Sequence, residues 1–357
     1  MLRTFKILFI FAVSFTVNAV AIAQNEICGT VIPDYIVDSV KHRIQSPFTT
    51  ITSYETTRDN FDTLYFPIQF HIIRRSDHTG GLDTSDIPVV LDILNSAYST
   101  AAILFYSCND IDYVDDDAYY NYPYNYKTQR TALESQYNYS NAINIYFFPA
   151  ITNNEGISLA GVSTFPDDIV NNSIAIKNSN ATYSTTPHEM GHYFNLYHTH
   201  ETCFGKEYVT RGVNANCSVA GDLCCDTPAD PNLNESGLVN LFCQYIGTLI
   251  DPLGEPYAPD PKNFMAYTRQ KSCRIHFTEE QYLRIRTAAF HPNRHLMAQH
   301  QCFRDTILSG TNNMSGYTIH LNNLQLNNAN LNINYCNEVV IESDFMMDNN
   351  STLTITP

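Results

Sequence analysis

Three histidines within a short stretch form the most chemically specific pattern of this sequence. The stretch reads HEMGHYFNLYH and runs from His188 to His198. His188 and His192 are four residues apart, so a helix would place both imidazoles on one face, where they can share a metal ion. Glu189 lies beside His188 and can reach a water on that metal without being a ligand itself. The spacing therefore predicts a metal centre that activates water.

The third histidine requires the predicted helix to end sharply. A continuous helix would carry His198 about 9 Å along the axis from His192, away from the metal. Asn195 lies where the chain needs a left-handed residue, and asparagine tolerates that conformation best after glycine. Three neutral imidazoles leave one tetrahedral position for water, which is the arrangement of a catalytic zinc site. The alternative is three histidines that merely lie in a helix and a loop.

The histidine stretch resembles the metzincin zinc signature. The segment NFMAYT, which begins at Asn263, resembles the methionine-containing turn that lies beneath the metal in metzincins. Within that group the chain is similar to the pappalysin-like secreted metallopeptidases (the cytophagalysin and ulilysin group). The resemblance covers roughly residues 60–303, and further matching positions are Gly221, Asp222, Asp226, Thr227, Pro228, Cys273, Phe277, Thr278 and Gln281.

The resemblance implies a zinc endopeptidase that cleaves proteins or peptides. A water activated by zinc would attack the peptide bond, with Glu189 as general base. Tyr267 matches the tyrosine that stabilises the oxyanion in related metzincins, although it could also be an ordinary core tyrosine. Met265 is expected to pack below the histidines. A substrate would pair as an added strand with the segment upstream of the zinc helix, which comprises Leu159, Ala160, Gly161, Val162 and Ser163.

Strand and helix patterns alternate through the first half of the chain, which indicates an α/β fold. Together with the resemblance, this predicts a metzincin-type catalytic domain with a mixed twisted sheet, an active-site helix and an irregular, disulfide-held C-terminal subdomain. A β-rich segment should follow. Strands are expected at Leu64–Ile73, Ile103–Val114, Ala142–Phe148 and Leu159–Phe165, and helices at Asp83–Ala102 and Thr278–Ala289.

The N-terminus and the composition point to export. Residues 1–23 combine Arg3 and Lys6 with an apolar run and a small-residue cleavage site, as in a secretory signal peptide. Ten cysteines agree with an oxidising, extracellular compartment. The net charge of −16 argues against nucleic acid as a partner. No transmembrane span is expected once the signal is removed.

The predicted domains are the signal peptide, a propeptide or N-terminal arm at 24–60, the peptidase domain at 61–303, and a β-rich accessory or sorting segment at 304–357. The last segment contains no Lys or Arg after Arg304 and is rich in Asn turns. It reads as the start of a β-solenoid that stops in mid-pattern. Contact with a cell surface or a carbohydrate is one role for it.

Cysteine chemistry leaves two alternatives at the start of the mature chain. A thiolate at Cys28 could occupy the water position on zinc and keep a zymogen silent, and several pappalysin-like zymogens have a cysteine near this point. The alternative is a disulfide. The resemblance also implies two bridges, Cys217–Cys243 and Cys225–Cys273.

Two further features concern ions and specificity. Asp222 and Asp226 lie in an acidic loop that resembles a calcium-binding region of the family, although composition alone favours a solvated loop. Some family members have acids after the Met-turn tyrosine and prefer a basic residue after the cut. Here the acids are absent, and Arg269 and Lys271 are present. If these bases line the pocket, an acidic or polar side chain is the better guess.

Three functions remain in competition after the sequence alone. The first is the secreted zinc endopeptidase. The second is a catalytically silent adhesion or binding protein that uses the β-rich C-terminal segment. The third is a zinc hydrolase of non-peptide substrates such as a polysaccharide or a lipid. The presence of all expected catalytic residue types favours the first.

Overall fold

A seven-stranded sheet forms the centre of the molecule, in the order β1-β8-β9-β6-β2-β3, with β4 also paired to β2. The computed structural model describes residues 27–45, 63–107, 110–140, 142–168, 171–294, 300–341 and 344–356, so the predicted signal peptide lies outside it. The strands are β1 (Ile27–Cys28), β2 (Leu64–Arg74), β3 (Ile103–Tyr106), β4 (Asp112–Asp115), β6 (Ile143–Phe148), β8 (Leu159–Ser163) and β9 (Ser173–Lys177).

The sheet is mixed, as predicted. Every pairing is parallel except that of β8 with β9. Every residue of β6 is buried, because strands and helices cover both of its faces. The single strand expected over Ile103–Val114 is wrong. This stretch forms two strands, since β3 pairs with the start of β2 and β4 pairs with its end.

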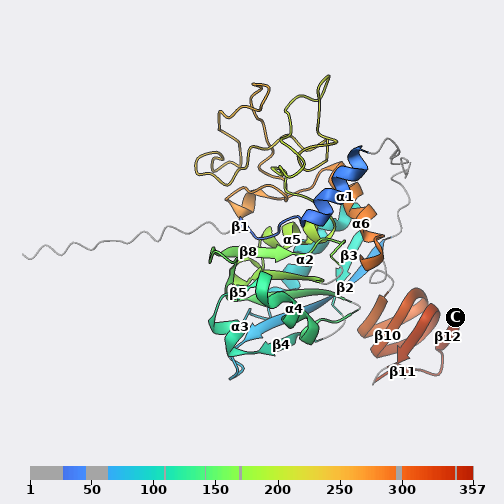
Figure 1. The fold of residues 1–357 in the computed structure, drawn as a ribbon. Coiled ribbons are helices and arrows are strands. Elements are labelled where there is room, and N and C mark those ends of the chain that lie inside the picture. Colours follow the sequence, from blue (N-terminus) through green and yellow to red (C-terminus); the bar gives the residue numbers. More distant parts are fainter. Residues whose placement is uncertain are drawn as a thin grey trace, which may run out of the picture.

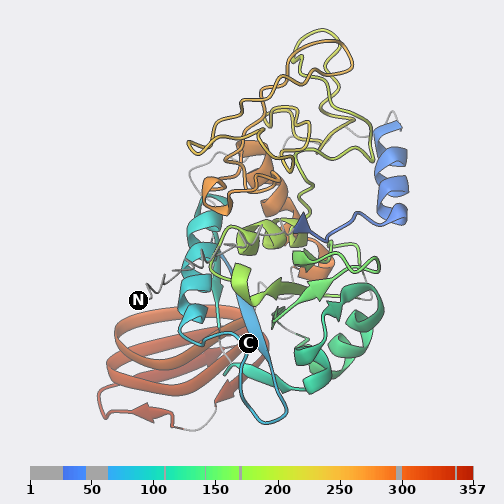
Figure 2. The same cartoon turned by 90° about the vertical axis from the view of Figure 1, so that its left-hand side faces the viewer.

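Helix α5 (Thr185–Tyr193) carries the first two histidines and is buried along its whole length. It packs against β8, β9 and α2 (Asp86–Tyr98), and the Tyr98 hydroxyl donates to the Pro187 carbonyl at 2.9 Å. Figures 1 and 2 show the helices arranged around the sheet. The remaining helices and short strands are α1 (Asp34–Gln45), α3 (Asp117–Asn121), β5 (Tyr124–Asn125), α4 (Tyr126–Tyr137), β7 (Ile151–Thr152) and α6 (Glu279–Ala289).

The stretch from 194 to 270 contains no helix or strand, only isolated β-bridges, and lies at the top of Figure 1. Disulfides Cys217–Cys225 and Cys243–Cys273 hold it, with Cα–Cα distances of 5.0 and 5.4 Å. The predicted bridges therefore used the right four cysteines in the wrong pairs. Cys217 closes a loop of its own with its neighbour eight residues on, whereas Cys243 ties its loop to the short helix η3 (Lys271–Cys273).

A chain of hydrogen bonds connects the start of α6 to the Met-turn. Thr278 and Gln281 form a capping box at the α6 N-terminus. The Gln281 amide also exchanges two hydrogen bonds with the Asn263 amide, at 2.7 and 3.2 Å. The Asn263 Oδ1 in turn accepts from the Met265 N–H at 2.8 Å. The position of Met265 therefore depends on a correctly capped α6.

The C-terminal segment coils into stacked parallel strands, as its β-rich pattern predicted. The elements are β10 (His300–Ile341), β11 (Met346–Met347) and β12 (Thr352–Thr356). Asn330 pairs in parallel with Thr352, one coil later. Left-handed residues such as Asn323 and Asn328 provide bends within β10. The inner face buries Ile319, Leu321, Leu324, Leu326, Leu331 and Ile333, which stack into a core of their own. Among the described residues, no helix is long and apolar enough to cross a membrane.

The capping box gives a stability prediction. Replacing Thr278 with Ala removes the side-chain acceptor for the Gln281 N–H and should lower the free energy of unfolding by about 1 kcal/mol, measured by denaturant titration. The Thr287→Ala variant is the control, because the hydroxyl of this exposed residue bonds within the same helix to the Leu283 carbonyl. Equal losses in the two variants would contradict a specific role for the cap.

Candidate active site

The end of α5 returns the third histidine to the first two. Asn195 has a φ of 68°, the left-handed conformation that the spacing predicted. The turn is closed by the Leu196 N–H, which donates to the Gly191 carbonyl at 2.9 Å. The Leu196 carbonyl then contacts His192 Nδ1 at 2.8 Å. The same turn therefore reverses the chain and orients a histidine.

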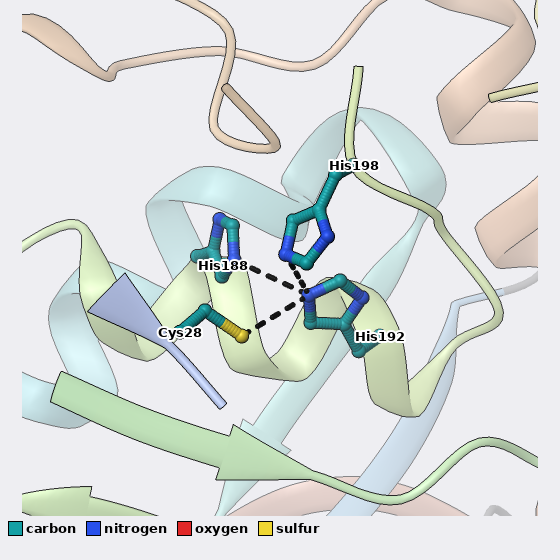
Figure 3. Close-up of side chains that lie close together, drawn as sticks. All are labelled: Cys28, His188, His192 and His198. Carbon is teal, nitrogen blue, oxygen red and sulfur yellow. Dashed lines mark hydrogen bonds between the residues drawn. The ribbon is translucent and has the colours of Figure 1, made fainter. Parts of the chain in front are cut away.

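The three imidazoles converge on one point. His192 Nε2 lies 3.2 Å from His188 Nε2 and 3.0 Å from His198 Nε2 (Figure 3). His188 Nδ1 contacts the Phe264 carbonyl at 2.7 Å, so Nδ1 carries the hydrogen and Nε2 presents a lone pair. The same reasoning applies to His192, so the contact between these two Nε2 atoms is not a hydrogen bond. Nitrogens bound tetrahedrally to zinc at about 2.1 Å lie about 3.4 Å apart, and this donor set fits zinc.

Burial keeps the three imidazoles neutral. It lowers the pKa of His192 to about 3 and lowers the pKa of His188 and His198 well below the ordinary value. Mutual repulsion among the rings acts in the same direction for His188 and His198. Metal binding requires the neutral form of histidine, so the site has no proton to displace near neutral pH.

Glu189 lies beside the histidines, and its two carboxylate oxygens have different surroundings. Its Oε2 accepts from Thr30 Oγ1 at 3.0 Å and from Cys28 Sγ at 3.4 Å. Its Oε1 is buried and has no hydrogen-bond partner in the described part of the chain. Burial raises the pKa of Glu189 to about 7. The side chain packs on Gly161 of β8, where an added Cβ would lie 2.8 Å from Glu189 Cγ. The absence of a side chain at Gly161 therefore leaves space for the Glu189 carboxylate.

The Met-turn supplies a fully buried methionine and a partly buried tyrosine. Met265 is fully buried beneath α5, and a Cβ at Gly191 would lie 2.6 Å from its sulfur. The Tyr267 ring lies 4.5 Å from the His198 ring, centre to centre. Burial raises the pKa of Tyr267, so its hydroxyl is a neutral donor, and it donates to the Cys28 carbonyl at 2.9 Å.

The N-terminal segment already lies in the cleft as an extended strand. Strand β1 pairs in parallel with β8, which would otherwise be the edge of the sheet. The Gly29 N–H donates to the Gly161 carbonyl at 2.8 Å, and the Ser163 N–H donates to Thr30 Oγ1 at 2.8 Å. Cys28 Sγ lies 3.5 Å from His192 Nε2, and burial raises the pKa of this thiol. The sulfur and the three histidine nitrogens lie within 4.8 Å of one another.

The two aspartates expected in one calcium-binding loop have different surroundings. Asp226 accepts from Thr278 Oγ1 and the Glu280 N–H, so it serves the start of α6. Asp222 is buried, and one of its oxygens accepts from Thr227 Oγ1 and the Cys224 N–H, whereas the other has no partner among the residues that the structure describes. Burial raises the pKa of Asp222 to about 7. The two aspartates therefore have different hydrogen-bond partners, although the charge of Asp226 also raises the pKa of Asp222.

The sequence analysis did not identify three residues that lie close to the histidines, Glu189 and Tyr267. Thr30 bonds to Glu189 but has no motif of its own. His200 follows His198 by two residues and lies with its ring 4.3 Å from that of Tyr267. The Arg274 guanidinium reaches to 3.4 Å from the Ala266 carbonyl. Only His200 had a signal, as the last residue of the HTH triplet.

A family model described as Pregnancy-associated plasma protein-A matches residues 125–290, which include the three histidines and the Met-turn. This match identifies residues 125–290 as part of a pappalysin-like metzincin metalloendopeptidase domain. The fold of the chain resembles that of a promirolysin variant from Tannerella forsythia, at 16% identity and a TM-score of 0.50, over 76% of this chain and 97% of that one. Mature mirolysin of the same organism, solved with a cleaved peptide, matches at 16% identity and a TM-score of 0.49, over 67% and 97%. No curated protein matched significantly.

The contact between Gly161 and Glu189 gives a prediction for the peptidase domain. Replacing Gly161 with Ala would push the Glu189 side chain away from its position, because the new Cβ overlaps it. Peptide cleavage should fall at least ~10-fold while the bound zinc, measured by metal analysis, is unchanged. The Gly212→Ala variant is the control, since a Cβ there meets nothing within 4 Å. Unchanged cleavage by Gly161→Ala would refute the constraint.

Proposed function

We propose that this protein is a secreted zinc-dependent endopeptidase in which Glu189 is the general base. The observation that carries the proposal is the extended segment at Ile27–Thr30. It lies along β8, and its Cys28 carbonyl meets the Tyr267 hydroxyl, so the cleft accepts a peptide strand within reach of Glu189 and the histidines. An elongated peptide is the substrate that such a cleft fits.

Each of the residues around the cleft has its own role in the proposed reaction. His188, His192 and His198 would hold the zinc, which when bound polarises the scissile carbonyl and activates water. Glu189 takes a proton from the attacking water and later delivers it to the leaving amine. Its raised pKa suits a group that must both accept and return a proton near neutral pH. The neutral Tyr267 hydroxyl donates to the carbonyl oxygen as negative charge develops there.

Removing the base tests the proposal directly. In the chain activated by Cys28→Ala, adding Glu189→Ala should leave the zinc bound and lower cleavage of a mixed peptide library by about 10²-fold or more, because proton transfer then lacks its acceptor. Glu255→Ala, which changes an exposed glutamate, should cleave like the parent. A zinc chelator should abolish cleavage by the parent and by the Glu255→Ala variant. Cleavage that survives in Glu189→Ala would contradict the assigned role.

We further propose that Cys28 keeps the full chain latent by occupying the fourth position on the zinc. The 3.5 Å distance from its sulfur to His192 Nε2 supports this, as does β1 lying where a substrate strand would pair. A thiolate is a strong zinc ligand, and metal binding would offset the raised pKa that burial gives the free thiol.

A substitution at Cys28 tests latency separately. The full chain with Cys28→Ala should cleave peptides sooner and faster than the parent, by ~10-fold or more in initial rate, since the thiolate no longer competes with water. Cys203→Ala removes another cysteine without a disulfide and should remain latent. Equal latency in both variants would show that the sulfur is not the block.

Export through the N-terminal signal and a structural calcium ion at Asp222 belong to the same proposal. The buried, unpartnered Asp222 oxygen supports a cation there. Surface or carbohydrate contact by the C-terminal coils stays a prediction from the sequence.

A further inference from the structure

A cavity of about 350 Å³ opens beside the histidines, between the N-terminal half of α5 and the segment that follows the Met-turn. Three basic residues line it, Arg269, Lys271 and Arg274. The one acid among its lining residues is Glu189, the proposed general base. The wall of this cavity therefore carries an excess of positive charge beside the reacting groups.

Neither Arg269 nor Arg274 forms an ion pair with a described residue, although the Glu189 charge acts on Arg274 from a longer distance. Among the described residues, no carboxylate lies within ion-pair distance of the Arg274 guanidinium. Its Nη1 has long contacts at 3.4 Å to the Ala266 carbonyl and to His188, and its buried Nε has no hydrogen-bond partner among the described residues. Arg269 is exposed and likewise forms no ion pair with a described residue. A partly buried guanidinium with unused donors favours an incoming carboxylate.

The chemistry of cleavage decides which side of the cut faces this cavity. Glu189 delivers a proton to the leaving amine, so the residue that carries this amine lies on the Glu189 side of the zinc site. Both the cavity and a second hollow touch β1 and Tyr267, but the cavity is lined by His188 and Glu189, whereas the second hollow is lined by His198 and by neither of these two. The residue immediately after the scissile bond would therefore enter the basic cavity.

We propose that this cavity selects substrates with an acidic side chain, Asp or Glu, immediately after the scissile bond. The inference rests on the proposed peptidase function and specifies its substrate class. Arginine binds carboxylates through paired, charge-assisted hydrogen bonds, and the two neighbouring bases add attraction. A Lys or Arg side chain in the same place would meet like charge in a partly buried site. The geometry thus gives the cleft both an attractive and a repulsive element.

Matched peptides test the selection. Three peptides would differ only after the cut, with Glu, Gln or Lys, so that Gln matches Glu in shape without its charge. The chain, activated by processing or by Cys28→Ala, should cleave the Glu peptide with a kcat/KM ~10-fold above the Gln peptide, and the Lys peptide more slowly still. Raising the salt concentration should narrow these differences, because they arise from charge.

Charge reversal provides the second readout. The double variant Arg269→Glu and Lys271→Glu should raise cleavage of the Lys peptide relative to the Glu peptide by ~10-fold or more. Lys206→Glu makes the same kind of change at an exposed position outside the cavity and should leave the ratio as it is. Peptide cleavage with no preference for Glu, or an unshifted ratio in the double variant, would overturn the inference alone. A chain that cleaves none of the peptides would overturn the peptidase function with it.

Discussion

Three neutral imidazoles converge inside the protein, and the rest of the structure depends on this arrangement. His192 Nε2 lies 3.2 Å from His188 Nε2 and 3.0 Å from His198 Nε2. Such lone pairs repel one another unless a cation lies between them, so the fold must impose the convergence. It does so with backbone carbonyls, since Phe264 and Leu196 each fix one ring through its Nδ1. These carbonyls play the part that second ligand shells play in zinc enzymes. The metal site and the backbone around it are therefore one unit.

Distant parts of the chain cooperate in that unit. The α6 cap positions the Gln281 amide, which bonds to Asn263 and so sets the Met-turn. The Met-turn brings the Phe264 carbonyl to His188 and the Met265 sulfur to α5. On the other side, β8 presents a glycine to Glu189 and a strand edge to β1. A single cleft thus joins the three histidines, Glu189, the Tyr267 hydroxyl and the edge of β8.

The sequence predicted the parts of this site that depend on local spacing. The histidines and Asn195 lie within one helix and one turn, so their geometry follows from helical periodicity and the left-handed preference of asparagine. Contacts across long separations left no such pattern. Thr30 meets Glu189 over 159 residues, and periodicity carries no trace of that contact. The disulfide pairs were wrong for the same reason, because four cysteines in one irregular region allow more than one pairing.

The strands show the same limit. The apolar runs at β2, β6 and β8 identified buried strands nearly to the residue. The sequence did not predict the break between β3 and β4. This break arises because β3 and β4 pair with different parts of β2, which lies elsewhere in the chain. Likewise, two bases after the Met-turn suggested the character of the specificity pocket. The partly buried Arg274 became visible only when the chain was folded.

The most direct test of this account is anomalous X-ray scattering at the zinc absorption edge from crystals of the full chain. The account predicts one strong peak about 2.1 Å from Nε2 of His188, His192 and His198, with Cys28 Sγ at about 2.3 Å as the fourth ligand. A peak elsewhere, or the three nitrogens converging with no metal after growth in zinc, would contradict it.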